Sequence, residues 1–171
     1  MFGFLVGAAL LAPTAFGQAS DATQADQGNQ ILAFQTMAPV DGAFVGPTSP
    51  IRDVPGGGLP WIISSAAGEL RDDGHLKVQV RGLVLARTDV VPEARRGINP
   101  APTFHAIVSC QTLDAQGTPS TQSVRTADQA ATTTGDADID TQISLPQPCL
   151  GPVVFVTGGN DLGNWFAVSG A

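Results

Sequence analysis

Apolar and polar side chains alternate along several short segments of this chain, as they do in a strand with one buried face. In residues 76–81, leucine and valine alternate with lysine, glutamine and arginine. Residues 61–70 before it also read as extended, and the intervening Asp73-Gly74 is a turn signal. We therefore predict a β-hairpin here, with Gly82 marking a bulge after its second strand.

The same pattern recurs further along the chain. Residues 104–111 place Phe104 and Cys110 on one face and His105 on the more polar face. Other extended segments are 31–37, 120–126, 152–157 and 164–170, and turn-forming residues separate strands at intervals of roughly ten positions. No helical periodicity of useful length follows residue 30. The pattern predicts an all-β fold, a single-domain antiparallel β-sandwich of seven to nine strands.

Two stretches do not fit strands. Residues 39–60 hold five prolines and five glycines in 22 positions, which excludes a helix or a central strand. We expect a long Pro/Gly-rich loop, or an edge ribbon laid over the sheet. Residues 87–102 form a second irregular stretch, and its Arg95-Arg96 pair fits a dibasic processing site or a charged loop tip equally well.

Three aspartates occupy every second position in "TGDADIDTQISLP". Asp136, Asp138 and Asp140 suggest a calcium loop, but an EF-hand starting at Asp136 needs Gly and Glu where Thr141 and Gln147 stand. Alternation with Ala137, Ile139 and Ile143 instead predicts a strand whose aspartates face solvent. We assign no metal site, and the three aspartates remain weak candidates for opportunistic calcium binding.

The N-terminus predicts export. Its apolar run from Phe2 to Ala12 is broken by Pro13 and is too short to span a membrane. Small residues follow at suitable positions for cleavage. We expect a signal peptide at 1–19, a flexible leader at 20–30 and one β-sandwich domain at 31–171, with an N-terminal anchor as the alternative to cleavage.

The charge balance limits the partners. Eight basic and fifteen acidic side chains give a net charge of −7, which disfavours nucleic acid and anionic membrane surfaces. Cys110 and Cys149 are the two cysteines, and in an exported protein the expected state is one disulfide bond. Paired metal-binding cysteines are the alternative, but the chain lacks a CxxC motif and a nearby histidine.

Catalytic chemistry has few candidates. The only histidines are His75 and His105, which we expect at the surface near strand ends. There is no GxSxG motif, and "PGGGLP" lacks the lysine of a phosphate-binding loop. We therefore assign no catalytic or cofactor-binding residue and expect no cofactor.

Trp61 and Trp165 are the candidates for a binding surface. Trp165 and Phe166 point to opposite faces of the last strand, so one packs inside. The other is either exposed as a binding anchor or covered by the proline-rich loop.

Several segments, "IRDVPGGGLPWIISSAAGEL", "PAPTFHAIVSC", "LPQPCLGPVVFVT" and "NWFAVSGA" among them, resemble a family of small secreted proteins of unknown function in bacteria and fungi. The resemblance runs from about residue 35 to the end. It implies secretion, one domain and pairing of Cys110 with Cys149. It carries no catalytic residue across.

Together these observations predict a secreted, acidic, non-enzymatic β-sandwich that acts as an extracellular binding or surface module. Its partner would be an extracellular protein or a glycan, and no membrane insertion is expected after signal cleavage. The alternative is a secreted hydrolase or metal-dependent enzyme that uses His75 or His105 with aspartates.

Overall fold

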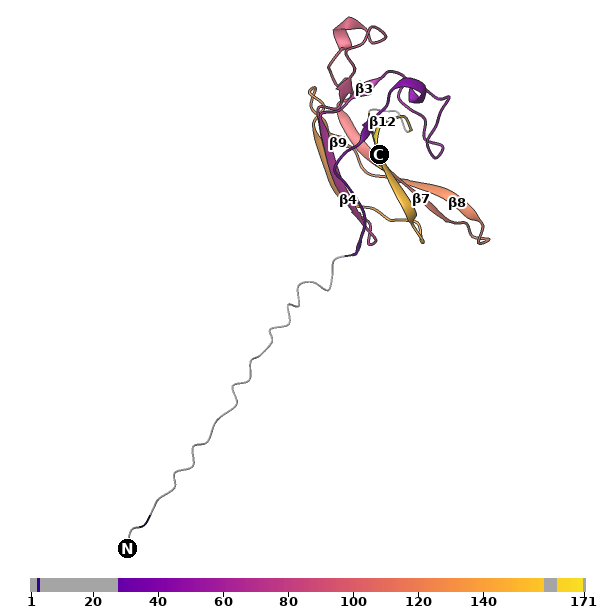
Figure 1. Cartoon of the computed structure of the whole chain (residues 1–171). Coiled ribbons are helices and arrows are strands. Elements are labelled where there is room, and N and C mark those ends of the chain that lie inside the picture. The colour runs from indigo at the N-terminus through magenta and orange to yellow at the C-terminus, as the bar shows by residue number, and fades with distance from the viewer. Residues whose placement is uncertain (1–2, 4–27, 159–162, 171) are drawn as a thin grey trace.

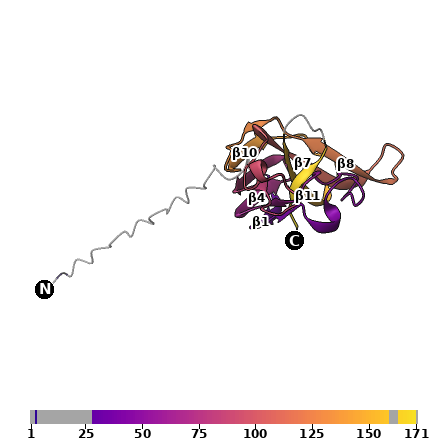
Figure 2. The ribbon, with the colours of Figure 1, turned by 90° about the horizontal axis from the view of Figure 1, so that it is seen from above.

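A computed structural model of the protein describes residues 3, 28–158 and 163–170 of the 171-residue chain. Two antiparallel sheets form its layers, which Figures 1 and 2 show from the side and from above. The first sheet has the order β1-β4-β5-β10. Its strands are β1 (Gln30–Phe34), β4 (Ser65–Arg71), β5 (His75–Arg81) and β10 (Ala137–Gln142).

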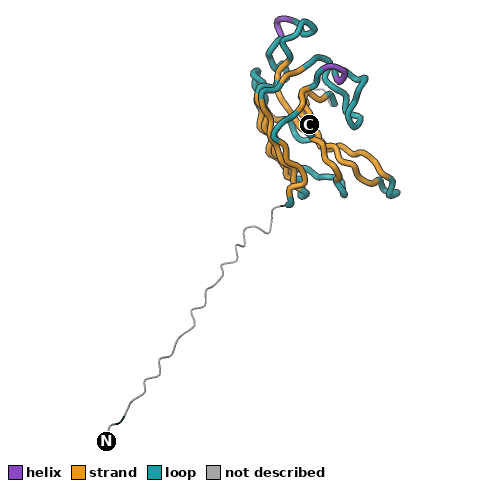
Figure 3. The backbone as a smooth tube through the Cα atoms, in the orientation of Figure 1, coloured by secondary structure: helices purple, strands orange, loops and turns teal. Residues whose placement is uncertain are grey.

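The second sheet has the order β2-β12-β11-β7-β8, and β9 also pairs with β7. Its strands are β2 (Ala38–Pro39), β7 (Thr103–Leu113), β8 (Pro119–Arg125), β9 (Gln129–Ala130), β11 (Leu150–Gly158) and β12 (Trp165–Val168). A small ribbon of β3 (Trp61–Ile62) and β6 (Val84–Leu85) lies at one end of the sandwich. Two 3-10 turns, η1 (Gly42–Phe44) and η2 (Glu93–Arg95), interrupt the loops in Figure 3.

The core lies between the two sheets. The alternating apolar residues of β5 and β7 are fully buried: Leu76, Val78, Val80, Phe104, Ala106 and Val108. Removing this apolar surface from water is the main favourable contribution to folding. At Gly68 the chain has no room for a side chain, because an added Cβ would lie 2.3 Å from the Phe34 ring. The predicted all-β sandwich is confirmed, with the Asp73-Gly74 turn joining β4 to β5.

The predicted disulfide is confirmed as well. Cys110 is buried in β7 and bonds to Cys149, which precedes β11 by one residue. Because β11 pairs with β7 antiparallel, the bond fastens the loop before β11 to its neighbouring strand.

The proline-rich loop covers the outer face of the second sheet. Arg52 donates hydrogen bonds to the carbonyl oxygens of Ser109 at 2.9 Å and Gly151 at 2.6 Å. Gly57 donates its N–H to the Trp165 carbonyl at 2.9 Å. As a result β7 is buried on both faces, including the side predicted to be more polar.

Three predictions on boundaries need correction. Among the described residues there are twelve strands, not seven to nine, because four of them are only two residues long. The predicted leader 20–30 ends too late: Gly28 donates its N–H to Asp73, Asn29 bonds Asp72, and Gln30 already belongs to β1. Gly82, at φ +65°, follows the last residue of β5 and does not form a bulge within a strand.

The expected signal peptide and most of the leader lie outside the described residues, apart from Gly3. Within the described part of the chain, we find no helix that is both long and apolar enough to span a membrane.

Candidate functional site

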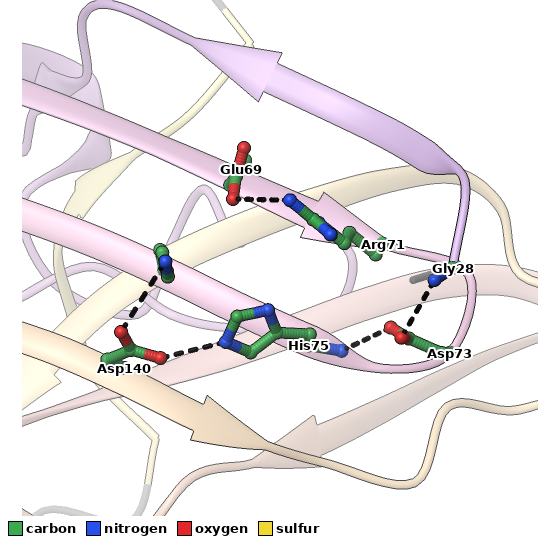
Figure 4. Close-up of polar contacts among 7 residues, drawn as sticks. Gly28, Glu69, Arg71, Asp73, His75 and Asp140 are labelled. Atoms are coloured by element: carbon green, nitrogen blue, oxygen red, sulfur yellow. Dashed lines mark hydrogen bonds and ion pairs between the residues drawn. The ribbon is translucent and has the colours of Figure 1, made fainter. Parts of the chain in front are cut away.

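Charged, histidine and aromatic side chains gather in three regions of the structure. These are the outer face of the first sheet, the covered outer face of the second sheet, and a hollow at the end of the sandwich. On the first sheet, Glu69, Lys77 and Asp140 stand directly opposite one another on β4, β5 and β10. Figure 4 shows the contacts of this row. Such cross-strand pairs of opposite charge stabilise a sheet.

Asp140 is the centre of the row. Its two oxygens lie 2.8 Å from His75 Nε2 and 3.7 Å from Lys77 Nζ. The hydrogen bond from His75, aided by the Lys77 charge, lowers the pKa of the Asp140 carboxyl. Glu69 in turn contacts Arg71 at 3.5 Å. These charges therefore neutralise one another within the sheet.

Of the three aspartates predicted to face solvent on a strand, two do so. Asp138 and Asp140 project from β10 with 61 % of each side chain exposed. Asp136 does not: it precedes β10, and its carboxylate accepts hydrogen bonds from the Gly82 N–H at 2.9 Å and the Thr134 hydroxyl at 2.8 Å. The Gly82 hydrogen bond is the main reason that the pKa of Asp136 is lowered.

Asp136 is thus a turn-capping residue, because the chain reverses at 132–135 just before the strand begins. The described residues contain no group of three or more histidine, cysteine, aspartate or glutamate side chains placed to hold a metal ion. The aspartates therefore gain no further support as a calcium site.

A shallow hollow of about 410 Å³ lies on this same face. It is lined by Gln30, Ala33, Gln35, Ala67, Gly68, Glu69, Lys77, Gln79, Asp138, Ile139 and Asp140. Its lining contains no aromatic ring, and the charged groups around it are already paired with one another.

On the second sheet, His105 is fully buried, which corrects its predicted place at the surface. Its Nδ1 lies 3.0 Å from Asp128 Oδ1, and Arg125 Nη2 donates to the same oxygen at 2.7 Å. Burial, followed by the Arg125 charge, lowers the pKa of His105, and Asp128 opposes that shift.

Thr157 of β11 stands directly opposite His105, and Trp165 of β12 stands opposite Thr157. Each carries a buried polar atom without a hydrogen-bond partner: His105 Nε2, Thr157 Oγ1 and Trp165 Nε1. Trp165 is 1 % exposed beneath the proline-rich loop, so the prediction of an exposed anchor is wrong there and the alternative of loop cover is confirmed.

The two histidines are not brought together. His75 lies on the first sheet and His105 on the second, each against its own aspartate. Neither is among the residues that line the three hollows described for the molecule. The histidine-based enzyme hypothesis therefore lacks a shared centre.

The third region has an aromatic floor. Trp61 of β3 stacks on Phe166 of β12, with ring centroids 4.1 Å apart and planes 13° from parallel. The pair lies at a hollow of about 420 Å³, which we name the aromatic hollow. Its lining consists of Gly58, Leu59, Trp61, Leu85, Arg95, Pro100, Ala101, Pro102, Gly158 and Phe166. Trp61 is 4 % exposed, so it forms part of the floor of the hollow, and its predicted role in a binding surface stays a prediction.

Arg95 is the only charged residue in that lining. It belongs to η2 in the loop that projects at the top of Figure 1. Its exposed guanidinium makes no hydrogen bond or ion pair with any residue that the structure describes. Arg96 beside it is engaged, with Asp89 at 3.2 Å and the Val91 carbonyl at 2.9 Å. The sequence offered only the dibasic pair as a signal and did not distinguish these two arginines.

Comparison with known proteins adds no functional assignment: no family model matches the chain, and neither the curated proteins nor the solved structures gave a match. The resemblance to small secreted proteins stays a prediction, and the function must be argued from the geometry.

Proposed function

We propose that this protein is an exported, non-enzymatic binding module that takes its ligand in the aromatic hollow. The observation that carries the proposal is the stacked Trp61–Phe166 pair, which lines the same hollow as Arg95 with its unpaired guanidinium. Ligand sites are typically concave and largely apolar, with a few polar groups that orient the ligand. The aromatic hollow is lined by two aromatic rings and one charged residue, whereas the lining of the hollow on the first sheet has four charged residues and no aromatic ring.

The place of action proposed is outside the cytoplasm. The N-terminal apolar run supports export, and the Cys110–Cys149 disulfide is compatible with an oxidising compartment. An extracellular protein or a glycan remains the proposed class of natural partner.

An enzyme using His75 or His105 with aspartates is the second candidate. The observation in its favour is the 3.0 Å contact of His105 with Asp128, since a carboxylate orients the imidazole in many hydrolases. It is the weaker candidate because the His105 side chain is fully buried. Hydrolysis of 4-nitrophenyl acetate that His105→Gln abolishes in a folded variant would reverse this order.

A fragment screen by ligand-detected NMR tests the binding proposal. The wild-type mature protein is compared with Gly58→Phe, which adds a ring at the lining of the aromatic hollow. An added Cβ at Gly58 meets no atom within 4 Å, so the variant should fold normally. We expect fragments that bind the wild type and lose binding in Gly58→Phe. Hits that bind both proteins equally, or the absence of hits, would contradict the proposal.

A further inference from the structure

We infer that the ligand of the aromatic hollow is an apolar molecule carrying one carboxylate. This inference rests on the binding function proposed above and specifies the chemistry of the ligand. It is drawn from the residues that line the hollow and from the charge that they leave unpaired.

The lining accounts for the apolar part of the ligand. Two stacked aromatic rings form the floor, and two leucine, one alanine and two proline side chains line the hollow with them. An aromatic or branched aliphatic group placed there would leave water and contact rings and methylene groups.

Arg95 accounts for the carboxylate. No acidic residue lines the aromatic hollow, although the whole protein carries a net charge of −7. The aromatic hollow of this acidic protein therefore carries a positive charge, and that charge favours an anionic ligand over a cationic one. A guanidinium presents paired N–H donors that match the two oxygens of a carboxylate. The Arg95 guanidinium has no partner among the described residues, and the carboxylate of the ligand would supply one.

Two sources share this chemistry: a free arylalkanoic acid, and the terminal carboxylate of a peptide that ends in an apolar residue. The first probe series therefore uses 3-phenylpropionate with its neutral amide and with 3-phenylpropylamine, three molecules of similar shape and different charge. The second series uses an acetylated tetrapeptide ending in phenylalanine, as the free acid and as the C-terminal amide.

Affinities are measured by ligand-detected NMR titration of the mature protein. We expect the acid to bind about tenfold more tightly than the amide, as one charge-assisted contact provides, and the amine not to bind. Arg95→Gln should remove the difference between acid and amide, and Arg95→Lys should restore part of it. Arg87→Gln is the matched control: this arginine is exposed on the same loop but lies outside the lining, so affinity should stay unchanged.

The outcomes separate the two proposals. If acid, amide and amine bind equally and all three are lost in Gly58→Phe, the binding site stands and the carboxylate inference is wrong. If the acid advantage survives Arg95→Gln, or disappears equally in Arg87→Gln, the role of Arg95 is wrong. If no probe binds, both proposals fail. Tighter binding of the peptide acid than of 3-phenylpropionate would identify the chain terminus as the source, and the reverse order would identify the free acid.

Discussion

Replacing both Cys110 and Cys149 with alanine removes a cross-link between residues 39 positions apart. In the chain-entropy treatment, a cross-link that closes a loop of this length lowers the entropy of the unfolded chain. Removing it should therefore lower the free energy of unfolding by about 4 kcal/mol at 25 °C. For a domain of this size we expect the melting temperature to fall by roughly 12–20 °C. The double alanine variant avoids leaving a free thiol in the core.

The assay is urea unfolding of three samples: wild type, wild type under reductant, and the double alanine variant. If the cross-link is responsible, reduction should cost nearly as much free energy of unfolding as the double substitution. If the alanine variant loses more free energy of unfolding than the reduced wild type, the difference measures the packing contribution of the buried Cys110 sulfur. A change of less than about 1 kcal/mol on reduction would refute the reasoning, since it lies well below the expected range.

Three further predictions follow from other contacts. Because the folded-state pKa of His105 is lowered, the unfolded chain binds the proton first as the pH falls. The free energy of unfolding should therefore fall as the pH drops below about 6.5, and in urea titrations it should fall less steeply in His105→Gln. Asp136→Ala should cost about 1 kcal/mol through its lost turn hydrogen bonds, whereas Asp138→Ala should leave stability unchanged in the same assay. Mass spectrometry of the exported protein should give a mature chain beginning at Ser20, and an intact N-terminus would contradict export with cleavage.

Much of the fold could be predicted because strand formation leaves a local signal. The alternation in residues 76–81 reports which side chains point inward, and the structure buries those residues. The disulfide could be predicted from the small number of cysteines. The alternation failed at Asp136 because the chain reverses immediately before β10, and a turn residue can continue the period of a strand by chance.

The candidate site could not be predicted in the same way, because it depends on contacts between distant segments. His105 occupies the more polar face of β7, and contacts from distant segments help to bury that face, among them Arg52 of the 39–60 loop, which bonds the Ser109 carbonyl. The aromatic hollow combines Gly58, Arg95 and Phe166 from three separate parts of the chain. No spacing in the sequence reports such a meeting, and the two tryptophans could be named only as candidates for a binding surface.

The two tryptophans allow the most direct test of ligand binding in the aromatic hollow. Trp61 lines the hollow, whereas Trp165 packs against Phe155 and Phe44 beneath the proline-rich loop. The indole N–H resonances are followed by protein-detected NMR in ¹⁵N-labelled mature protein during titration with 3-phenylpropionate, with Trp61→Phe used to assign them. We predict that the Trp61 resonance shifts with saturation while the Trp165 resonance stays in place. An unchanged Trp61 resonance, or a saturable shift confined to Trp165, would contradict the account.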